Sequence, residues 1–471
     1  MLGLFGTLEL GSRSLQNQRQ GVEVTGHNIA NADNPAYARQ RLQIQTSFAL
    51  ETSFGQQGTG ATAVSISRLR NDLLDERVRE EMSVSSFLEA QQEALQYAQG
   101  ALGQEVDRQG DVAGISVSSE QALSSRLNDF FAGLQSVSGS PESTSDRQAF
   151  VMKAVELATR FNQVDQRLAG LQEELNTSLQ TSTTKANGLL TEIADLNRQI
   201  QRAELGDAGP ANDLRDLRQQ RIEEFSKLVK TDLSTDADGT LNLSVGGVTL
   251  VSGKDVLDRL QAYDPGNGML RLRAETAGTP LNITSGSIAA AISTRDGEVA
   301  TLRRDLNTLA STVITEVNAL HRTGFNLAGG TGADLFTGSG SADIAVNAQI
   351  VSNPSLLQLS AVAGASGDNQ VALGLARLAE KTHSALNNAT FSDNYSHVVG
   401  GLGHALSSVN SQVEDQERVT NLLSSQRDSV SGVSLDEEMT NMMKYQKAFE
   451  ASARLITVVE EMLDTVMNMK R

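Results

Sequence analysis

The sequence lacks several residue types and patterns, and each absence narrows what this 471-residue chain can do. Cysteine is absent, which excludes disulfides, thiolate metal sites and thiol catalysis. Tryptophan is also absent and aromatic residues amount to 4%, which disfavours an aromatic-filled core or a surface on which nucleic-acid bases stack. No apolar run reaches the length of a membrane span, and the first residues lack the cationic region and apolar core of a cleavable secretory signal.

Basic residues are in short supply as well. The chain has 57 acidic and 39 basic residues and a formal net charge of −18, which argues against nucleic acid and anionic membranes as partners. Its length and its 39% of hydrophobic residues are typical of a globular protein with two to four domains. Composition alone would favour a cytoplasmic location.

Residues for catalysis or metal binding are sparse. The five histidines form no HExxH motif and no carboxylate-paired spacing. The glycine cluster at 329–340 lacks the spacing and the lysine of a phosphate-binding loop. Asp236 and Asp238 resemble the start of a calcium loop, but Val245 stands where a bidentate glutamate is needed, so we expect a hairpin turn. The sequence predicts no enzyme activity, no cofactor, no metal and no small-molecule substrate.

The C-terminal stretch 431–471 has the strongest pattern. Apolar residues recur there every seven positions, as in a helix that packs along another helix. The first row is Leu435, Met442, Phe449, Ile456 and Leu463, and a flanking row holds Tyr445, Val459 and Val466. Ser434 and Glu437 form a capping box, so the helix should begin just after Gly432. A terminal helix on the order of 55 Å long cannot bury its own apolar row, so it needs a partner.

A candidate partner lies at the other end of the chain. The residues that recur there every seven positions are Leu8, Leu15, Val22 and Ile29. Asn34-Pro35 should end this helix, because the proline ring disfavours a helical conformation at the preceding residue. We predict that the two ends pair; the alternative is that each row belongs to the ordinary core of one helical domain.

The sequence between the two ends alternates between helical and strand-like patterns. Apolar spacings of three and four predict helices at about 69–102, 123–134, 150–200, 213–229, 302–320, 371–388 and 396–430. The stretch 150–200 is one long helix or a helical hairpin, because a Ser/Thr-rich patch weakens its apolar row. Alternating patterns predict short strands or an extended arm at 37–66 and an antiparallel β unit at 231–287, whereas 103–119 and 323–370 are rich in small residues and irregular.

These elements predict a mainly α fold with an inserted β domain and a long helical bundle or coiled-coil core formed by the terminal segments. The predicted domains are a terminal coiled coil (1–66 with 431–471), a helical bundle (67–230 with 288–430, including the irregular segment 323–370) and a small antiparallel β domain (231–287).

Both ends of the chain resemble one protein family. The segment GVEVTGHNIANADNPAYARQR, residues 21–41, resembles the N-terminal signature of the flagellar rod, hook and hook-associated family. The matching positions are His27, Asn28, Ile29, Ala30, Asn31, Pro35, Tyr37, Arg39 and Gln40. The segment 431–467 resembles the C-terminal end of the hook-associated members. Ala36 stands where the family has a glycine that can adopt a positive φ, so the turn there should be built differently. The chain is short for the family, which suggests that an outer β domain is reduced or missing.

The resemblance implies a structural role at the junction between hook and filament, needed for filament assembly. The terminal helices would form the inner tubular layer in a ring-like oligomer of identical subunits, with the hook protein below and the second hook–filament junction protein above. It also implies an extracellular location in the flagellum, reached by type III export without a cleaved signal, which replaces the cytoplasmic expectation. The apolar rows of the two terminal helices would form the assembly seam. A flagellar export chaperone would bind part of that seam, namely Leu435, Met442, Phe449, Ile456, Val459 and Leu463.

Two other interpretations stay open at the level of the sequence. Another axial protein, of hook or rod type, would share the N-terminal signature but not the pattern of 431–471. A secreted helical adhesin or interaction protein would fit the helices but not the HNIANA motif at 27–32.

Overall fold

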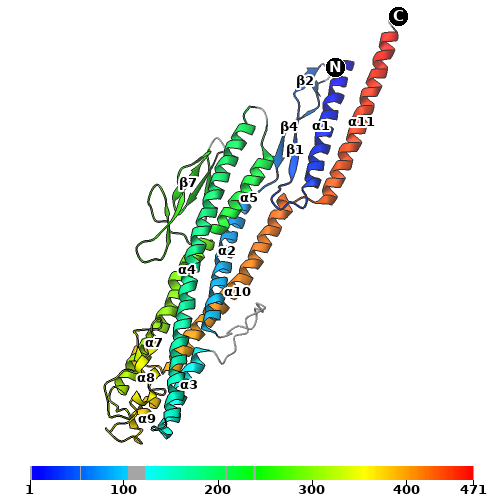
Figure 1. Cartoon of the computed structure of the whole chain (residues 1–471). Helices are drawn as coiled ribbons and strands as arrows, with labels where there is room; N and C mark the ends of the chain where they lie inside the picture. Colours follow the sequence, from blue (N-terminus) through cyan, green and yellow to red (C-terminus); the bar gives the residue numbers. More distant parts are fainter. Residues whose placement is uncertain (1–2, 53–54, 104–121, 207–208, 237–239, 470–471) are drawn as a thin grey trace.

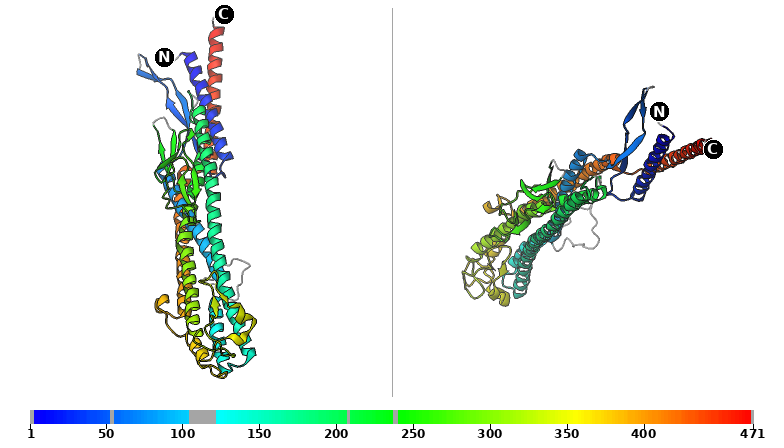
Figure 2. Two further views of the ribbon diagram at one scale, coloured as in Figure 1. Left: turned by 60° about the vertical axis from the view of Figure 1, so that its left-hand side comes forward. Right: turned by 90° about the horizontal axis from the view of Figure 1, so that it is seen from above.

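The computed structural model describes residues 3–52, 55–103, 122–206, 209–236 and 240–469. The molecule is elongated, with long helices along its axis and with the N- and C-termini at the same end (Figure 1, Figure 2). Its fold is mainly α with small inserted sheets, which confirms the predicted fold class.

The longest element is α4 (Thr144–Ala203), a helix of 60 residues and roughly 90 Å. Its N-cap is Ser143, whose hydroxyl accepts a hydrogen bond from the backbone N–H of Asp146. The Ser/Thr-rich patch does not interrupt the helix, because Leu179 is buried and the buried Thr183 hydroxyl donates to the Leu179 carbonyl at 2.7 Å. The stretch is therefore one helix and not a hairpin.

Other long helices pack around α4 or along one another, and α2 lies against α10 over much of its length (Figure 1). They are α2 (Asp72–Leu102), α3 (Leu123–Gly139), α5 (Asn212–Leu228), α6 (Ser287–Thr294), the π-helical turn η2 (Arg295–Val299), α7 (Ala300–His321) and α10 (Phe391–Ser431). At the end of the molecule far from the termini, the core centres on Phe130, whose ring lies 5.4 Å from that of Phe150 and 5.6 Å from that of Phe336.

The helix predicted at 371–388 is wrong in its second half. Helix α9 (Gln370–Arg377) ends eleven residues earlier, and only the short 3₁₀ turn η4 (Ser384–Leu386) follows. After Arg377 the chain makes a tight turn, in which the backbone N–H of Ala379 donates to Ala376 and that of Glu380 to Arg377. Asn387 and Asn388, with φ values of 56° and 61°, then end η4, because a left-handed conformation does not continue a helix. Helix α10 then begins at Phe391, before the predicted residue 396, because the Thr390 hydroxyl caps it. The loop predicted at 103–119 falls outside the described residues except for Gly103, and so does the Asp238 of the calcium-like turn.

The predicted β unit is present and packs against α4 and α5, forming a second apolar core (Figure 1). Four antiparallel strands follow one another in the sheet, and a separate hairpin adds two more. The strands are β5 (Asp232–Thr235), β6 (Leu241–Val245), β7 (Val248–Ser252) and β8 (Asp255–Val256), and the hairpin pairs β9 (Leu260–Tyr263) with β10 (Arg271–Ala274). The irregular segment 323–370 holds β11 (Phe336–Thr337), β12 (Ala345–Val346), α8 (Ala348–Ser352) and the 3₁₀ turn η3 (Pro354–Leu356).

The two ends of the chain meet at the end of the molecule where α1 (Leu4–Ala30) lies beside α11 (Leu435–Asn468) (Figure 1). A β ribbon continues from α1, as the alternating pattern at 37–66 predicted. It pairs β1 (Gln40–Thr46) with β4 (Ala61–Arg68) and, further out, β2 (Ala49–Thr52) with β3 (Gly55–Gly58). The Ser434 hydroxyl accepts from the backbone N–H of Glu437 and caps α11, which confirms the predicted start of this helix.

Candidate assembly site at the paired terminal helices

Helices α1 and α11 pack antiparallel and in a single register. From one contact to the next, the residue number increases along α1 and decreases along α11. The facing pairs are Gly11 with Ile456, Ser14 with Ser452, Gly21 with Tyr445 and Asn28 with Glu438. The predicted pairing of the chain ends therefore takes place within one subunit.

Two glycines allow α11 to approach α1 closely. A Cβ atom at Gly11 would lie 2.8 Å from Cγ1 of Ile456, and one at Gly21 would lie 2.5 Å from the ring of Tyr445. Real Cβ atoms do not approach other atoms so closely, so any larger residue would push the helices apart. Each glycine thus forms a notch in α1 that receives a large side chain of α11.

The apolar rows predicted from the sequence lie beside the centre of this contact. On α1, the half-buried members are Leu8, Leu15, Val22 and Ile29. On α11, the half-buried members are Met442, Tyr445, Ile456 and Leu463, and Val459 is buried. The exposed members are Leu435, Phe449 and Val466, at 50%, 40% and 54% exposure. The structure brings part of each row against the partner helix and leaves the rest in solvent.

The centre of the contact holds Tyr445 and Val459 of the predicted flanking row together with small and polar residues that the apolar pattern misses. Ser14, Gly21 and Asn28 follow one another at seven-residue intervals on α1, and Glu438, Tyr445, Ser452 and Val459 do so on α11. The Ser14 and Ser452 hydroxyls lie 2.8 Å apart. A search for a period of seven that included glycine, serine and asparagine would have found this row.

Helix α11 leaves a large apolar surface uncovered. All 34 of its residues are described, and among them only Glu438 and Val459 are buried. Its exposed large hydrophobic residues are Leu435, Met439, Met443, Phe449, Leu455, Val458, Met462, Val466 and Met467. Fully burying one such side chain contributes about 1.5–3 kcal/mol, so each of them favours a further contact that would cover it.

Asn28 of the HNIANA motif closes the seam at the end nearest the bundle. It is 1% exposed and uses both ends of its amide. Its Oδ1 accepts from the Tyr37 hydroxyl at 2.7 Å and from the backbone N–H of Gln40 at 3.0 Å, while its Nδ2 donates to the Gln40 carbonyl and to Glu438 Oε2, both at 2.9 Å. The Gln40 side chain donates onward to Asp213 of α5 at 2.8 Å. One asparagine therefore joins α1, the following strand and α11.

Arg39 forms ion pairs with the first turn of α11. Its guanidinium lies 2.6 Å from Glu437 Oε2 and 2.6 Å from Glu438 Oε1. Burial lowers the pKa of Arg39, but hydrogen bonds to the two carboxylates outweigh it and raise the pKa above its usual value, so this side chain stays charged. The Arg39 backbone N–H also donates to the Ser431 carbonyl at 2.8 Å, which ties this segment to the end of α10.

Tyr37 stays protonated in this cluster and acts as a hydrogen-bond donor. Burial raises the pKa of Tyr37 well above its usual value, and the nearby carboxylates of Asp213 and Asp216 raise it further. Its hydroxyl donates to Asn28 and lies 3.0 Å from Nδ1 of His27. The rings of His27 and Tyr37 meet edge to face at 5.4 Å.

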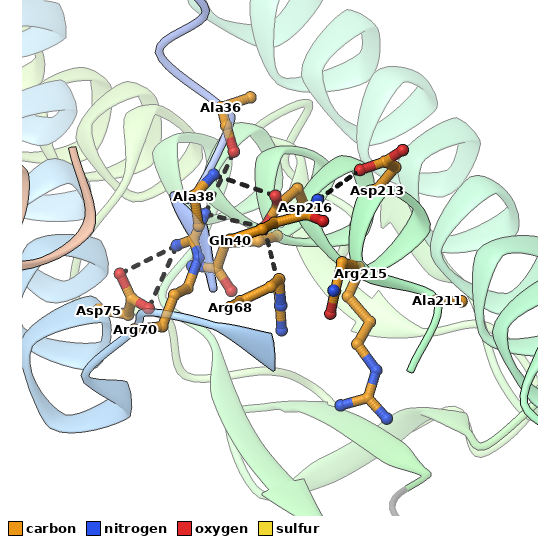
Figure 3. Close-up of polar contacts among 12 residues, drawn as sticks. Ala36, Ala38, Gln40, Arg68, Arg70, Asp75, Ala211, Asp213, Arg215 and Asp216 are labelled. Carbon is orange, nitrogen blue, oxygen red and sulfur yellow. Dashed lines mark hydrogen bonds and ion pairs between the residues drawn. The ribbon is translucent and has the colours of Figure 1, made fainter. Parts of the chain in front are cut away.

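Asp216 of α5 is a second residue that holds the terminal segments on the bundle. Figure 3 shows its carboxylate between the segment after α1 and the end of β4. It accepts from the backbone N–H of Ala38 at 3.0 Å, from Arg68 at 2.7 Å and from Arg70 at 3.4 Å. Arg70 in turn donates to Asp75 of α2 at 3.1 Å. Charged groups from three segments distant in sequence thus anchor the terminal helices to the bundle.

The turn after α1 does not use a positive φ. The helix ends at Ala30, and Asn31 caps it with its backbone N–H and its side chain, both of which donate to the His27 carbonyl. Asn34 Oδ1 then accepts from the backbone N–H of Ala36 at 3.2 Å, an Asx turn. Among the described non-glycine residues only 387 and 388 have positive φ, so Ala36 fits without strain.

The site has the character of a packing surface. Within the described part of the chain, no three histidine, aspartate or glutamate side chains are placed to hold a metal ion. No helix among the described residues has both the length and the hydropathy of a membrane span.

Two family descriptions match the chain. Residues 112–336 match the helical domain of the flagellar hook-associated protein FlgK, and residues 424–469 match the C-terminal region of the flagellar basal body rod FlgEFG proteins. The second match covers α11 and the end of α10.

Curated relatives match over nearly the whole chain. Flagellar hook-associated protein 1 of Bacillus subtilis is 29% identical over 99% of both chains, and that of Salmonella typhimurium is 23% identical over 97% of this chain and 98% of the relative. A solved structure, the flagellar hook junction protein FlgK from Burkholderia pseudomallei, superposes with a TM-score of 0.64 at 14% identity, covering 76% of this chain and 100% of that one. The last likeness shows a shared fold.

Proposed function

Because the chain belongs to the flagellar hook-associated protein 1 family and is a structural protein of the extracellular hook–filament junction, we propose that it builds this junction as a ring-like oligomer through its paired terminal helices. In this proposal, α1 and α11 of neighbouring copies form an inner tubular layer. The hook protein lies on one side of the ring, and the second hook–filament junction protein lies on the other. The protein acts by joining two tubes with different surfaces, and not by catalysis.

The observation that carries this proposal is the uncovered apolar face of α11. Within one subunit α11 packs mainly on α1, and exposed residues such as Val458 and Met462 remain at 49% and 46% exposure. Neighbouring copies would bury this face, which supplies the free energy of assembly. The segments 1–66 and 431–471 would then serve as the axial unit, while 67–230 with 288–430 and the β unit 231–287 would face outward.

The test is a charged substitution on that face. Val458→Glu with Met462→Glu should leave the helix pair of the subunit intact but abolish filament growth, because two carboxylates cannot be buried between copies. The readout is swimming on soft agar, hooks without filaments in electron micrographs, and filament protein leaking into the medium.

The matched control adds the same two charges to the polar side of the same helix. Gln446 and Thr457 are exposed and lie three turns apart on that side, so Gln446→Glu with Thr457→Glu should keep motility. Full motility of the Val458/Met462 variant would refute the proposal that this face is an assembly contact.

We propose further that the flagellar export chaperone covers part of this seam before assembly. Phe449 is 40% exposed, and Ile456 is half-buried against Gly11 of α1. Charged residues at Phe449 and Ile456 together should abolish chaperone binding by the full-length chain in a pull-down or titration. Unchanged binding would refute the idea that assembly and the chaperone share these residues.

A further inference from the structure

The seam between α1 and α11 raises a question of register. A pattern that repeats every seven residues meets its partner again when one helix slides by seven. Such a slide would place Ser452 at the Gly21 notch and Val459 against Ser14. Ser452 is smaller than the tyrosine that occupies the notch, so it would not clash there. The small and apolar part of the seam therefore does not by itself select one alignment.

The end of the seam nearest the bundle does distinguish the alignments. Asn28 and Glu438 are buried at 1% and 2% exposure and joined by a 2.9 Å hydrogen bond, and Arg39 pairs with the same glutamate. A slide by seven residues moves α11 by roughly 10.5 Å, which is far beyond hydrogen-bond reach. It would leave a buried amide facing an aromatic ring and separate a buried carboxylate from its partners, which is strongly unfavourable.

We propose that Asn28, Glu438 and Arg39 form a register lock that selects one of the heptad-related alignments of the two terminal helices. Polar residues in an otherwise apolar seam reduce its stability but specify its register, and this is the best attested use of such groups. The lock thereby sets how far α11 projects beyond α1.

The lock also connects this alignment to the bundle. The Arg39 backbone N–H donates to the Ser431 carbonyl at the end of α10, and the Arg39 carbonyl accepts from Leu69 just before α2, both at 2.8 Å. Arg39 therefore connects the first turn of α11 to the end of α10 and to the segment before α2. This inference concerns contacts within one chain and does not depend on how copies assemble.

The absence of cysteine permits a direct test in the full-length chain. The Ser14 and Ser452 hydroxyls are 2.8 Å apart, so S14C with S452C should form a disulfide in the native register under mild oxidation. S14C with V459C reports the slipped register, because in the native one these positions are separated by about seven residues of helix, roughly 10.5 Å. Both pairs are measured on dilute purified chain by non-reducing gel shift and mass spectrometry, which distinguish disulfides within a chain from those between chains.

The lock is removed by N28L with E438L, which replaces the polar pair with leucines and leaves Glu437 to pair with Arg39. We expect the ratio of native to slipped disulfide to fall about tenfold or more, on the scale of one buried polar contact. E438Q keeps a hydrogen-bonding side chain and should restore most of the native ratio when Asn28 is present. The control Q16L with E460L changes an amide and a carboxylate on exposed positions of the same helices and should leave the ratio unchanged.

Each cross-linking result tests one part of the proposal. If the ratio of native to slipped disulfide is unchanged in N28L/E438L, the lock is overturned. Loss of both disulfides in that variant would also overturn it, because the polar pair would then hold the helices together without selecting their register. Failure of S14C/S452C to cross-link within the otherwise unchanged chain would overturn the alignment itself. None of these results depends on filament assembly, so the proposed junction role stands or falls separately.

Discussion

Helices α4 and α11 have similar apolar patterns and very different surroundings. In α4, 25 of 60 residues are buried, and they face the bundle helices and the β unit of the same chain. In α11, two of 34 are buried, and one of those two is a glutamate. The comparison teaches that periodicity predicts an amphipathic helix and the face that it buries, but does not say whether the partner belongs to the same molecule.

The two seams also differ in chemistry. The α4 seam is mainly apolar, with Phe150, Leu157, Phe161, Leu168 and Leu175 all buried. The seam between α1 and α11 is narrow and is built from glycines, serines and a buried polar cluster. The first supplies stability to the subunit. The second supplies alignment, and its flanks remain open to other molecules.

The largest expected effect comes from the same truncation in each helix. Phe161→Ala in α4 should lower the free energy of unfolding of the subunit by about 3–5 kcal/mol, because this ring is fully buried. Phe449→Ala in α11 should lower it by less than about 1 kcal/mol, because that ring is 40% exposed. Urea unfolding of the purified chain, followed by circular dichroism, measures both. Equal losses would show that α11 is as much a part of the subunit core as α4.

A smaller effect is expected where α4 holds the β unit. Asn187 of α4 donates to the Leu260 carbonyl at 2.8 Å and accepts from the Leu260 N–H at 2.9 Å, like an added residue of strand β9. Asn187→Ala leaves both backbone groups without this partner and should lower the free energy of unfolding by about 1–3 kcal/mol. Hydrogen exchange at β9 should accelerate in the variant. Thr191→Ala, at an exposed position one turn later, is the matched control.

The helices were predictable because their apolar spacing is long and regular. The sequence predicted α2, α3, α5, α7 and α11 to within a few residues, and also the β unit and the strands after α1. It failed at 378–388, where Leu378 and Leu386 continue a helical spacing but α9 ends at Arg377 and the asparagines that follow Leu386 adopt a left-handed conformation. Local backbone preference there prevails over the apolar pattern.

The candidate site was less predictable. The motif residues at 27–40 were recognised by resemblance, but their partners were not. Asp213 and Asp216 lie on α5, more than 170 residues away, and no local pattern marks them as neighbours of Gln40 or Ala38. Glu438 lies at the end of the seam nearest the bundle, and a search for apolar residues passes over a charged one. Long-range polar contacts depend on the tertiary fold, which sequence periodicity does not encode.

The pH dependence of stability should arise within the bundle. His321 at the end of α7 is fully buried, accepting from the Gln358 N–H and bonded to the Ala333 carbonyl, and burial lowers its pKa below the ordinary 6.5. As pH falls below about 6.5 the unfolded chain takes up a proton that the folded chain does not, so the free energy of unfolding should decrease, by at most about 1.4 kcal/mol per pH unit. The decrease ends at the lowered pKa of the folded state.

Substitution separates this effect from other titrations. His321→Gln should remove the part of the slope that begins near pH 6.5, as measured by urea unfolding at a series of pH values. His27→Gln, in the exposed cluster at the terminal helices, should leave that slope in place. A slope unchanged by His321→Gln would show that the buried imidazole is not its source.

The smallest expected difference concerns two ion pairs, one in each region. Glu204 at the end of α4 holds Arg215 of α5 through two contacts of 2.6 and 2.7 Å, and both side chains are partly buried. Lys447 and Glu450 of α11 lie 3.0 Å apart and are exposed. The hydrogen bond from Arg215 holds the pKa of Glu204 below its usual value, against the effect of burial.

Because the folded-state pKa of Glu204 is depressed, its contribution is present above the ordinary value of 4.5 and disappears as pH falls through the lowered pKa. Glu204→Gln should therefore reduce the free energy of unfolding by about 1 kcal/mol at neutral pH and by little in acid. Glu450→Gln should change it by less than about 0.5 kcal/mol at either pH, because exposed pairs are screened by solvent. An equal loss in both variants at neutral pH would mean that the α11 pair is shielded from water in the isolated subunit, contrary to a helix whose outer face awaits another copy.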